Sequence, residues 1–335
     1  MKKIRLHPGA WEKERVSMRT VVITGGNAGL GYACAAAMLA SKEGPPWQVV
    51  LACRDLERGR AAVGQLTQIS GASGRVETML LDLASLASIR LFATQLIDRV
   101  QAGTIPPFHG LVCNAGVQSW TKRSFTADGF EATFAVNHLG HFLLVNMLLS
   151  ILNPRARIVV VASGVHDPAN NWGLPAPAWN DTAALSRGEL GSAAAMDKSV
   201  ARGQRLYTTS KLANIYFTYA LARHLPPGVT ANAFDPGLTP GTGLTREAPA
   251  PIRFIAKNIL PRAIPLLHHS YKTSNVHTID ESGHSMARLM TDPALAGTTG
   301  RYFQEQREVR SSSESYDEGR AAELWQTSAV LTGLS

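Results

Sequence analysis

Continuous apolar runs alternate with segments of helical periodicity through the first third of the chain. The runs predict buried strands at 20–24, 48–53, 76–83 and 110–116, and the segments between them predict helices at 30–42, 56–69 and 85–100. The runs lack the alternation of apolar and polar residues that a half-exposed strand shows. Such strands are typical of a parallel sheet covered by helices on both faces.

The same pattern continues further along the chain. Residues 156–163 and 229–237 predict two more strands, and 206–225 predict a long apolar helix between them. We find no repeat of fixed period and no interdomain linker. We therefore expect one α/β domain over 18–335, a doubly wound parallel sheet with helices on both faces, and an N-terminal extension at 1–17.

Two long segments interrupt the alternation. Residues 164–203 are rich in Pro, Gly, Asn and Ala, and 238–275 mix Pro and Gly with apolar and basic residues. Loops of this length in a compact domain are more often functional lids than simple connections. We expect 252–267 to cover an apolar substrate, with contact to a membrane surface as the alternative, and we place His268 and His269 in the solvated part of this lid.

Composition supports a globular protein from a reducing compartment. Of the 335 residues, 45% are apolar and 17% charged, which is enough apolar material for a buried core. Three widely spaced cysteines predict neither a disulfide framework nor a zinc cluster. The basic start of the chain lacks the apolar centre of a signal peptide, and 142–152 is too short to span a bilayer. These features predict a cytoplasmic protein without an integral membrane segment.

The net charge of +8 raises the question of nucleic-acid binding. The basic residues are scattered, with no lysine or arginine run and no interleaved aromatic platform, which argues against that class. A basic protein that binds an anionic cofactor is the simpler interpretation.

A glycine-rich turn follows the first predicted strand and opens the first helix. In "TGGNAGLG" (24–31), glycines at 25, 29 and 31 permit a tight turn and let backbone amides approach a pyrophosphate at the helix N-terminus. At this position in an alternating chain, the turn predicts a Rossmann-type site for a dinucleotide.

The end of the second strand distinguishes the two nicotinamide cofactors. An acidic residue there would bind the ribose hydroxyls and repel a 2′-phosphate, but the strand ends with neutral Cys53 followed by Arg54. A guanidinium pairs with a phosphate through two hydrogen bonds. Although Asp55 is close, we expect NADP(H).

Tyr207 and Lys211 form the clearest candidate for proton chemistry. Their spacing in "YTTSK" places them one turn apart on one face of a helix. A nearby ammonium stabilises a phenolate, so we expect Lys211 to lower the pKa of Tyr207, the general acid/base. Alone, the pair would be a weak signal.

Taken together, the motifs give a specific resemblance. The chain resembles a classical short-chain dehydrogenase/reductase over about residues 20 to 305. The matching features, in the family's order, are "TGGNAGLG" (24–31), Asp82 in "LDL", "NAG" (114–116), Asn137, Ser163, "YTTSK" (207–211) and "PG" (236–237).

The resemblance implies hydride transfer between the nicotinamide and a carbonyl carbon. Ser163 would hydrogen-bond the developing alkoxide, Lys211 would also hold the nicotinamide ribose, and Asn137 would anchor a water that links the lysine to solvent. The implied catalytic residues are Tyr207, Lys211, Ser163 and Asn137. The implied cofactor-binding residues are Thr24, Gly25, Asn27, Gly29, Leu30, Gly31, Arg54, Asp82, Leu83, Asn114, Ala115, Gly116, Tyr207, Lys211, Pro236, Gly237 and Thr242.

Local detail narrows the branch. "ACRD", "SFTADGFEATFAVNHLGHFLL", "SKLANI" and "GTTGRYF" resemble retinol dehydrogenases and light-dependent protochlorophyllide reductases. Leu238 stands where the latter usually carry a cysteine. Gly241 stands where the family often has a threonine that holds the nicotinamide carboxamide, and Thr242 follows it.

His138 and His141 suggest a metal site by their spacing on one helix. No third ligand follows at a suitable distance, so we interpret them as packing residues and expect no metal. The tyrosine helix is apolar on most faces, which fits either core packing or a subunit contact and leaves the oligomeric state open.

Three functions remain at this stage. The first is an NADPH-linked oxidoreductase acting on a small-molecule substrate, a fairly large apolar carbonyl or alcohol. The second is a light-driven reductase of a tetrapyrrole double bond, against which Leu238 argues. The third is a regulatory protein that binds NADP(H) without turnover, although Tyr207, Lys211 and Ser163 are all retained.

Overall fold

The structure is a computed structural model that describes residues 18–119, 123–245, 248, 250–262, 264 and 275–334. These residues contain one sheet of eight strands in the order β3-β2-β1-β4-β5-β6-β7-β8. Strands β1 to β7 run parallel, and β8 pairs antiparallel with β7. The strands are β1 Arg19–Thr24, β2 Trp47–Cys53, β3 Val76–Leu80, β4 Phe108–Cys113, β5 Leu152–Val161, β6 Thr230–Asp235, β7 Tyr302–Gln304 and β8 Arg307–Val309.

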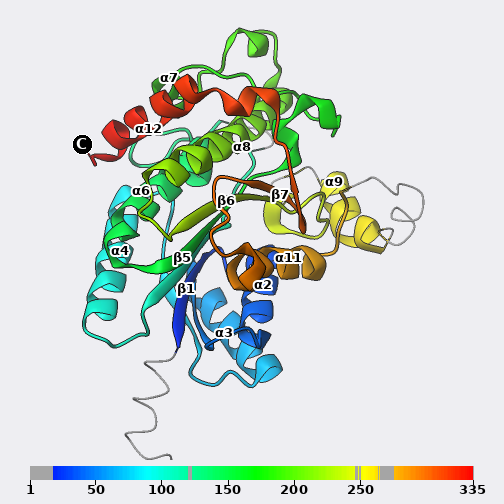
Figure 1. The fold of residues 1–335 in the computed structure, drawn as a ribbon. Coiled ribbons are helices and arrows are strands. Elements are labelled where there is room, and N and C mark those ends of the chain that lie inside the picture. The colour runs from blue at the N-terminus through cyan, green and yellow to red at the C-terminus, as the bar shows by residue number, and fades with distance from the viewer. Residues whose placement is uncertain are drawn as a thin grey trace, which may run out of the picture.

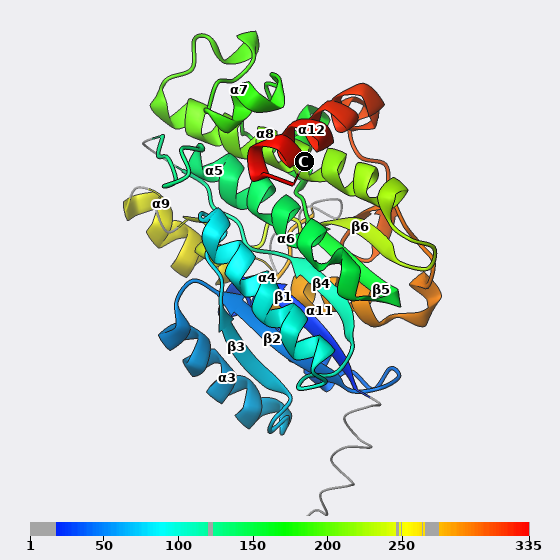
Figure 2. The same ribbon diagram turned by 90° about the vertical axis from the view of Figure 1, so that its left-hand side faces the viewer.

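Helices cover both faces of this sheet (Figures 1 and 2). On one face lie α2 Gly29–Ala40, α3 Leu56–Ser70 and α11 Ile279–Thr291. On the other lie α4 Leu86–Gln101, α6 Gly140–Leu148, α8 Ser199–His224 and α12 Glu318–Thr332. The doubly wound α/β fold predicted from the apolar runs is confirmed.

Short helical pieces connect these elements. The α-helical ones are α5 Ala132–Phe134, α7 Thr182–Ser186 and α9 Ala250–Phe254, and two π-helical turns are η1 Ala135–Leu139 and η7 Ile255–Ile259. The 3₁₀ turns are η2 Leu149–Ile151, η3 Gly164–His166, η4 Pro168–Asn170, η5 Ser192–Ala194, η6 Gly243–Thr245, η8 Pro293–Leu295 and η9 Ser313–Tyr316.

Neighbouring residues of each central strand belong to opposite hydrophobic layers. In β1, Val22 packs into the layer under α4, α6 and α8, whereas Val21 and Ile23 pack into the layer under α2 and α11. All three are fully buried. Because helices cover both faces of the sheet, the sequence of each central strand is an unbroken apolar run.

Truncation of a large buried side chain in these layers is costly. Replacing Phe92, which is fully buried, with Ala would lower the free energy of unfolding by about 3–5 kcal/mol.

The helical run Ala132–Ile151 is long and apolar enough to cross a membrane by length and composition alone. Two-thirds of its most apolar window (67%) is buried inside the fold, where Phe142 and Leu143 pack against α4 and α8. We therefore interpret it as a core helix.

The strand order reverses direction at β1, which lies between β2 and β4. The crossover connections on the two sides of β1 therefore lie on opposite faces of the sheet. As a result, the loops that follow β1 and β4 diverge, and a crevice forms between them at the carboxyl ends of the strands. In open α/β sheets, ligands bind at this point.

Candidate active site

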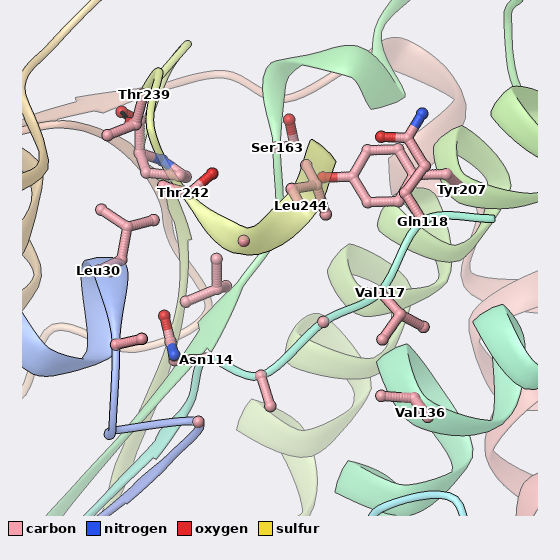
Figure 3. A pocket seen from close by; sticks show the side chains of 18 of the residues that line it. Leu30, Asn114, Val117, Gln118, Val136, Ser163, Tyr207, Thr239, Thr242 and Leu244 are labelled. Carbon is pink, nitrogen blue, oxygen red and sulfur yellow. Dashed lines mark hydrogen bonds between the residues drawn. The ribbon is translucent and has the colours of Figure 1, made fainter. Parts of the chain in front are cut away.

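A cavity of about 830 Å³ lies at the carboxyl ends of the central strands. Its lining combines the glycine turn after β1, the loops after β2, β4 and β5, and one face of α8. Figure 3 shows this pocket with Leu30 and Asn114 at one end and Ser163 and Tyr207 at the other. The geometry thus brings together the dinucleotide motif and the candidate proton donor, as the sequence predicted.

The glycine turn has the form that a pyrophosphate site needs. Gly25 and Gly29 have φ values of +65° and +56°, which other residues rarely adopt. A Cβ on Gly31 would lie 2.7 Å from both Asn114 Nδ2 and the carbonyl oxygen of Gly25. The turn therefore tolerates no side chain at these positions, and it leaves room for a dinucleotide against the N-terminus of α2.

Thr24 and Gly31 lie behind the cavity rather than at its wall. Their assignment to cofactor binding stays a prediction, and in the protein alone both residues shape the loop after β4. Thr24 Oγ1 accepts hydrogen bonds from the backbone amides of Asn114 and Ala115, both at 2.9 Å. Asn114 Nδ2 donates to the Thr24 carbonyl at 2.8 Å. Thr24 thus fixes the loop after β4, and the missing side chain of Gly31 lets Asn114 of that loop approach the glycine turn.

The remaining predicted cofactor residues line the cavity: Gly25, Asn27, Gly29, Leu30, Arg54, Asp82, Leu83, Asn114, Ala115, Gly116, Tyr207, Lys211, Pro236, Gly237 and Thr242. Thr242 comes from the second lid and lies opposite the turn, since a Cβ on Gly29 would be 3.9 Å from its side chain. Thr242 therefore lines the cavity beside the glycine turn, and its assignment as the partner of the nicotinamide carboxamide in place of residue 241 stays a prediction.

Two arginines line the far end of the cavity. Arg54 follows β2, and Arg58 lies in the first turn of α3. Asp55 caps this helix, because its Oδ1 accepts from the Arg58 amide at 3.0 Å. The Asp55 carboxylate, which complicated the choice between NAD(H) and NADP(H) from the sequence, thus caps the N-terminus of α3. Sequence reasoning missed Arg58, although its spacing of four from Arg54 was a usable signal.

Ser163 and Tyr207 meet at the other end of the cavity. Ser163 follows β5, and Tyr207 projects from α8 with its hydroxyl directed toward Ser163 (Figure 3). A neutral His166 holds the serine in place: its Nε2 accepts from the Ser312 amide at 3.0 Å, so its Nδ1 donates to the Ser163 carbonyl at 2.7 Å. Burial lowers the pKa of this histidine, which favours the neutral form.

The structure corrects the expected electrostatics of the tyrosine. Burial raises the pKa of Tyr207 far above its usual value, the Asp235 carboxylate raises it further, and a hydrogen bond with Ser163 opposes both. Lys211 does not lower it, because its Nζ donates to the Val161 carbonyl at 3.0 Å and lies 5.6 Å from the centre of the Tyr207 ring. In the protein alone, the tyrosine is therefore protonated.

Lys211 is itself unusual, with only 4% of its surface exposed. Burial lowers its pKa to about 8, and the Asp235 carboxylate opposes this change. Asp235, at the end of β6, is fully buried and accepts from the Gly237 amide at 3.0 Å and from Asn275 Nδ2 at 2.8 Å. Sequence reasoning missed this carboxylate, although an aspartate directly before "PG" at the end of an apolar strand was a signal.

Asn137 lies in the π-helical turn η1 and does not line the cavity. Its Oδ1 accepts from the Val117 amide at 2.8 Å, and its Nδ2 donates to the Val117 carbonyl at 3.0 Å and to Ser210 Oγ at 2.9 Å. The side chain therefore joins the loop after β4 to α8. Its backbone carbonyl lies 3.2 Å from His141 Nδ1. That Asn137 anchors a water beside Lys211 stays a prediction.

Both predicted lids contribute the apolar part of the lining. Trp172 and Leu174 come from the segment after β5, and Leu238 and Leu244 come from the segment after β6. Figure 3 shows Leu244 among the side chains that line the pocket together with Tyr207. Ile252 of α9, Ile255 of η7 and Leu260, the residue that follows η7, also line the cavity. His268 and His269 fall outside the described residues.

His138 and His141 are buried packing residues. His141 Nε2 lies 2.9 Å from Thr24 Oγ1, and His138 Nε2 lies 2.8 Å from Ser328 Oγ. Burial lowers their pKa values to about 3 for His138 and about 4 for His141. Within the described part of the chain, no cluster of three His, Cys, Asp or Glu side chains is placed to hold a metal.

Comparisons with known proteins agree with this geometry. The short chain dehydrogenase family model matches residues 19–173, and a model named AcuH dehydrogenase domain matches residues 243–335. Mouse (Mus musculus) retinol dehydrogenase 14 is 35% identical over 330 residues, covering 94% of this chain and 86% of that protein. The chloroplastic protochlorophyllide reductase of Chlamydomonas reinhardtii is 32% identical over 336 residues, covering 95% and 78%.

Solved structures share the architecture. An uncharacterised protein from Mycobacterium paratuberculosis superposes with a TM-score of 0.63 at 27% identity, covering 94% of this chain and 93% of that one. The Pseudomonas aeruginosa RhlG/NADP active-site complex superposes with a TM-score of 0.59 at 22% identity, covering 89% and 97%. At that identity, the second likeness bears on the fold alone.

Proposed function

Because this chain belongs to the short-chain dehydrogenase/reductase family, on the branch of the retinol dehydrogenases and protochlorophyllide reductases, we propose that it transfers hydride between NADPH and a large apolar carbonyl or alcohol. Its membership makes it an oxidoreductase that uses a nicotinamide cofactor. The preference for NADP(H) and the substrate class are the proposal.

One observation carries this function. The Tyr207 hydroxyl and Ser163 lie in the same cavity as the glycine turn and the loop 114–116. A dinucleotide held by that turn would extend toward the tyrosine, and a bound NADPH supplies a hydride to a carbonyl carbon placed there. The wall beyond Tyr207 is apolar, which suits a greasy substrate.

The side chains of this protein have separate roles in the reaction. Ser163 Oγ positions the substrate oxygen and donates a hydrogen bond as negative charge develops on it. Tyr207, protonated in this environment, delivers its proton to that oxygen. Lys211, whose Nζ donates to the Val161 carbonyl, would hold the nicotinamide ribose of the bound cofactor. The lid residues exclude water from the carbonyl.

The two arginines at the far end support the choice of NADP(H). Arg54 and Arg58 line the cavity where an adenosine ribose would end. Asp55 also lines the cavity, where its carboxylate caps α3. Two guanidinium groups beside one carboxylate leave this end of the cavity with a net positive charge, which suits a phosphate ester better than a free hydroxyl.

The test is a substrate panel followed by cofactor absorbance. Retinoids, fatty aldehydes, steroid ketones and protochlorophyllide are offered with NADPH or NADH, in the dark and in light. We expect oxidation of NADPH in the dark with at least one apolar carbonyl, and slower oxidation of NADH. Turnover only on illumination with protochlorophyllide would favour the pigment reductase instead. Tight NADPH binding without turnover of any compound would favour a regulatory protein.

A further inference from the structure

Asn275 is a buried side chain that holds the Asp235 carboxylate. Only 8% of its surface is exposed, and its Nδ2 donates to Asp235 Oδ2 at 2.8 Å. The other carboxylate oxygen, Oδ1, accepts from the Gly237 amide at 3.0 Å. A fully buried carboxylate depends on such donors, because burial without them disfavours its charged form.

The contacts of Asn275 fix the direction of its amide group. An ionised carboxylate only accepts hydrogen bonds, so the nitrogen of the amide must face Asp235. The amide oxygen then faces His277, whose Nε2 lies 2.8 Å away and donates to it. On the other side of the imidazole, Nδ1 lies 3.3 Å from Glu305 Oε1. The amide is therefore held from both ends, and it cannot turn without losing a hydrogen bond.

Asn275 also joins the two ends of the second long segment, 238–275. The Leu238 amide donates to the Asn275 carbonyl at 2.7 Å, and the His277 amide donates to the Leu238 carbonyl at 3.0 Å. A Cβ on Gly237 would lie 2.4 Å from the Asn275 carbonyl oxygen and 2.5 Å from its Oδ1. The glycine therefore lets Asn275 pack against the turn that begins this segment, and Leu238 of this turn lines the cavity.

Asp235 in turn lies against the segment that carries Ser163. A Cβ on Gly164, the residue after Ser163, would lie 3.0 Å from Asp235 Oδ2, the oxygen that Asn275 holds. The charge of Asp235 acts on four titratable side chains: Tyr207 and Lys211 of α8, Tyr302 of β7 and His166 of η3. The position of this one carboxylate therefore affects both the proton donor and the neighbouring lysine.

We propose that Asn275 is a positioning residue for the reaction, because it holds the Asp235 carboxylate against the Ser163 segment and connects it to both ends of the segment 238–275. This inference rests on the proposed function and names a residue outside the cavity on which that function depends. Asn275 does not line the cavity, so it acts through Asp235. Without the amide, the buried carboxylate takes up a proton more readily or turns away from Gly164, and its negative charge is lost from the side of Lys211.

The direct test is the protonation midpoint of Lys211, measured by NMR on the full chain labelled with ¹³C at the lysine Cε. The signal that is missing from Lys211→Met assigns this lysine. In Asn275→Leu we expect the midpoint to fall by about one pH unit, because a nearby negative charge stabilises an ammonium by at least that amount. In Asn275→Asp, two carboxylates share the place and keep at least one negative charge, so the midpoint should stay or rise. Asn275→Ala gives the same prediction as Asn275→Leu, should the leucine variant fail to fold.

Asn232→Leu is the matched control. Asn232 lies on the same strand as Asp235, and only 6% of its surface is exposed. Its Nδ2 donates to the Thr298 carbonyl at 2.7 Å, and its Oδ1 accepts from the Arg301 amide at 3.0 Å. The substitution removes a similar pair of hydrogen bonds, so the melting temperature should fall while the Lys211 midpoint stays at the wild-type value. An equal fall of the midpoint in both leucine variants would reflect lost stability alone and would overturn the proposal.

A double variant shows whether Asn275 acts through Asp235. Asp235→Asn alone should lower the Lys211 midpoint, and adding Asn275→Leu should lower it no further, because both substitutions remove the same charge. A second fall of similar size in the double variant would mean that Asn275 acts independently of the carboxylate. A midpoint that does not change in Asn275→Leu would mean that the amide does not position it. Either result overturns the proposal.

Turnover separates this role from the proposed reaction. The alkaline limb of kcat/KM for carbonyl reduction should move together with the NMR midpoint across these variants. If the midpoints move as expected but no carbonyl is reduced, Asn275 keeps its role and the proposed reaction fails. If carbonyls are reduced while Asn275→Leu leaves the midpoint and the alkaline limb in place, the reaction stands and the positioning role fails.

Discussion

Tyr207 is buried beside two groups of opposite charge. The Lys211 ammonium lies one turn along α8, and the Asp235 carboxylate lies at the end of β6. Asp235 raises the pKa of both Tyr207 and Lys211, so it favours the protonated form of each. The carboxylate therefore favours the protonation states that the proposed carbonyl reduction requires, although it does not line the cavity.

The pH dependence of carbonyl reduction follows from these shifts. Because the pKa of Lys211 is about 8, its ammonium is lost as pH rises through that value, and kcat/KM for reduction should fall there. Replacing Asp235 with Asn removes a group that raises both pKa values, so the alkaline limb should move to lower pH. Steady-state rates between pH 6 and 10 measure this shift.

Asp292→Asn is the matched control for this experiment. Asp292 pairs with Arg288 in α11, at 2.9 Å, and does not line the cavity. The pH profile of kcat/KM in the Asp292→Asn variant should coincide with that of the wild type. An alkaline limb that stays in place in Asp235→Asn would contradict the assigned role of this carboxylate.

At the scale of elements, the first turn of α3 carries the residues on which the proposed preference for NADP(H) depends. Asp55 caps the helix, Arg58 faces the cavity, and Arg60 points to solvent, where it pairs with Glu57 at 3.4 Å. Arg58 and Arg60 lie two positions apart on one helix, but only Arg58 lines the cavity. Arg60 is therefore a matched control for the effect of Arg58 on cofactor binding.

Arg58→Ala should weaken NADPH binding by about tenfold while leaving NADH binding unchanged, because only NADPH carries the 2′-phosphate that the guanidinium would pair with. Arg60→Ala should change neither, since its surface ion pair is worth little. Fluorescence titration of both cofactors measures the four constants. Equal losses for NADPH and NADH in Arg58→Ala would mean that this residue does not read the phosphate.

Elements with strong local signals could be predicted from the sequence. The run 20–24 fell within β1 because both faces of that strand are buried, and the glycine turn was recognisable from its spacing. The ends of helices were harder to predict. Helix α8 begins at Ser199, whereas the sequence predicted a start at 206, because the first two turns are polar and lack the apolar periodicity of the rest of the helix. The short strand β7 pairs with β6 across a long separation, and nothing local marks such pairing.

The residues of the candidate site also fall into those that the sequence could predict and those that it could not. Tyr207, Lys211 and Ser163 belong to motifs with fixed spacing, so they could be found before the fold was known. Asp235 and Asn275 depend on segments that meet only in three dimensions. The expected effect of Lys211 on Tyr207 was wrong for the protein alone, because burial outweighs a charge that is turned toward a backbone carbonyl.

For the whole molecule, the C-terminal segment supports α8, the helix that carries Tyr207. Helix α12 packs along α8, and Trp325 stacks on His224 with ring centroids 4.2 Å apart. Before α12, the carbonyl of Glu314 accepts from the Tyr216 hydroxyl at 2.8 Å, and Ser312 anchors His166. The last part of the chain therefore fixes both Ser163 and the helix that carries Tyr207.

Buried neutral histidines link the stability of this core to pH. The pKa of His138 is lowered to about 3 and that of neighbouring His141 to about 4, whereas in the unfolded chain both lie near 6.5. Below pH 6.5 the unfolded chain binds protons that the folded protein does not, so these groups destabilise the fold as pH falls from 6.5 toward 4.

His138→Phe should flatten this dependence. His138 lies among Phe134, Phe142 and Phe217, so a phenyl ring fits its surroundings. Melting temperatures at pH 7, 6, 5 and 4 should fall less steeply in this variant than in the wild type. The exposed His284→Phe is the control and should keep the wild-type slope. Identical slopes in all three proteins would show that His138 contributes nothing to acid destabilisation.

The central claim is that Tyr207 supplies the proton in a hydride transfer. It is tested most directly by kcat/KM for the best carbonyl substrate, with the NADPH dissociation constant, in Tyr207→Phe. The control is Tyr219→Phe, on the same helix but hydrogen-bonded to Ser311 outside the site. We predict that Tyr207→Phe loses at least about a hundredfold in kcat/KM with NADPH affinity intact, and that Tyr219→Phe keeps its activity. Turnover retained by Tyr207→Phe would contradict the account.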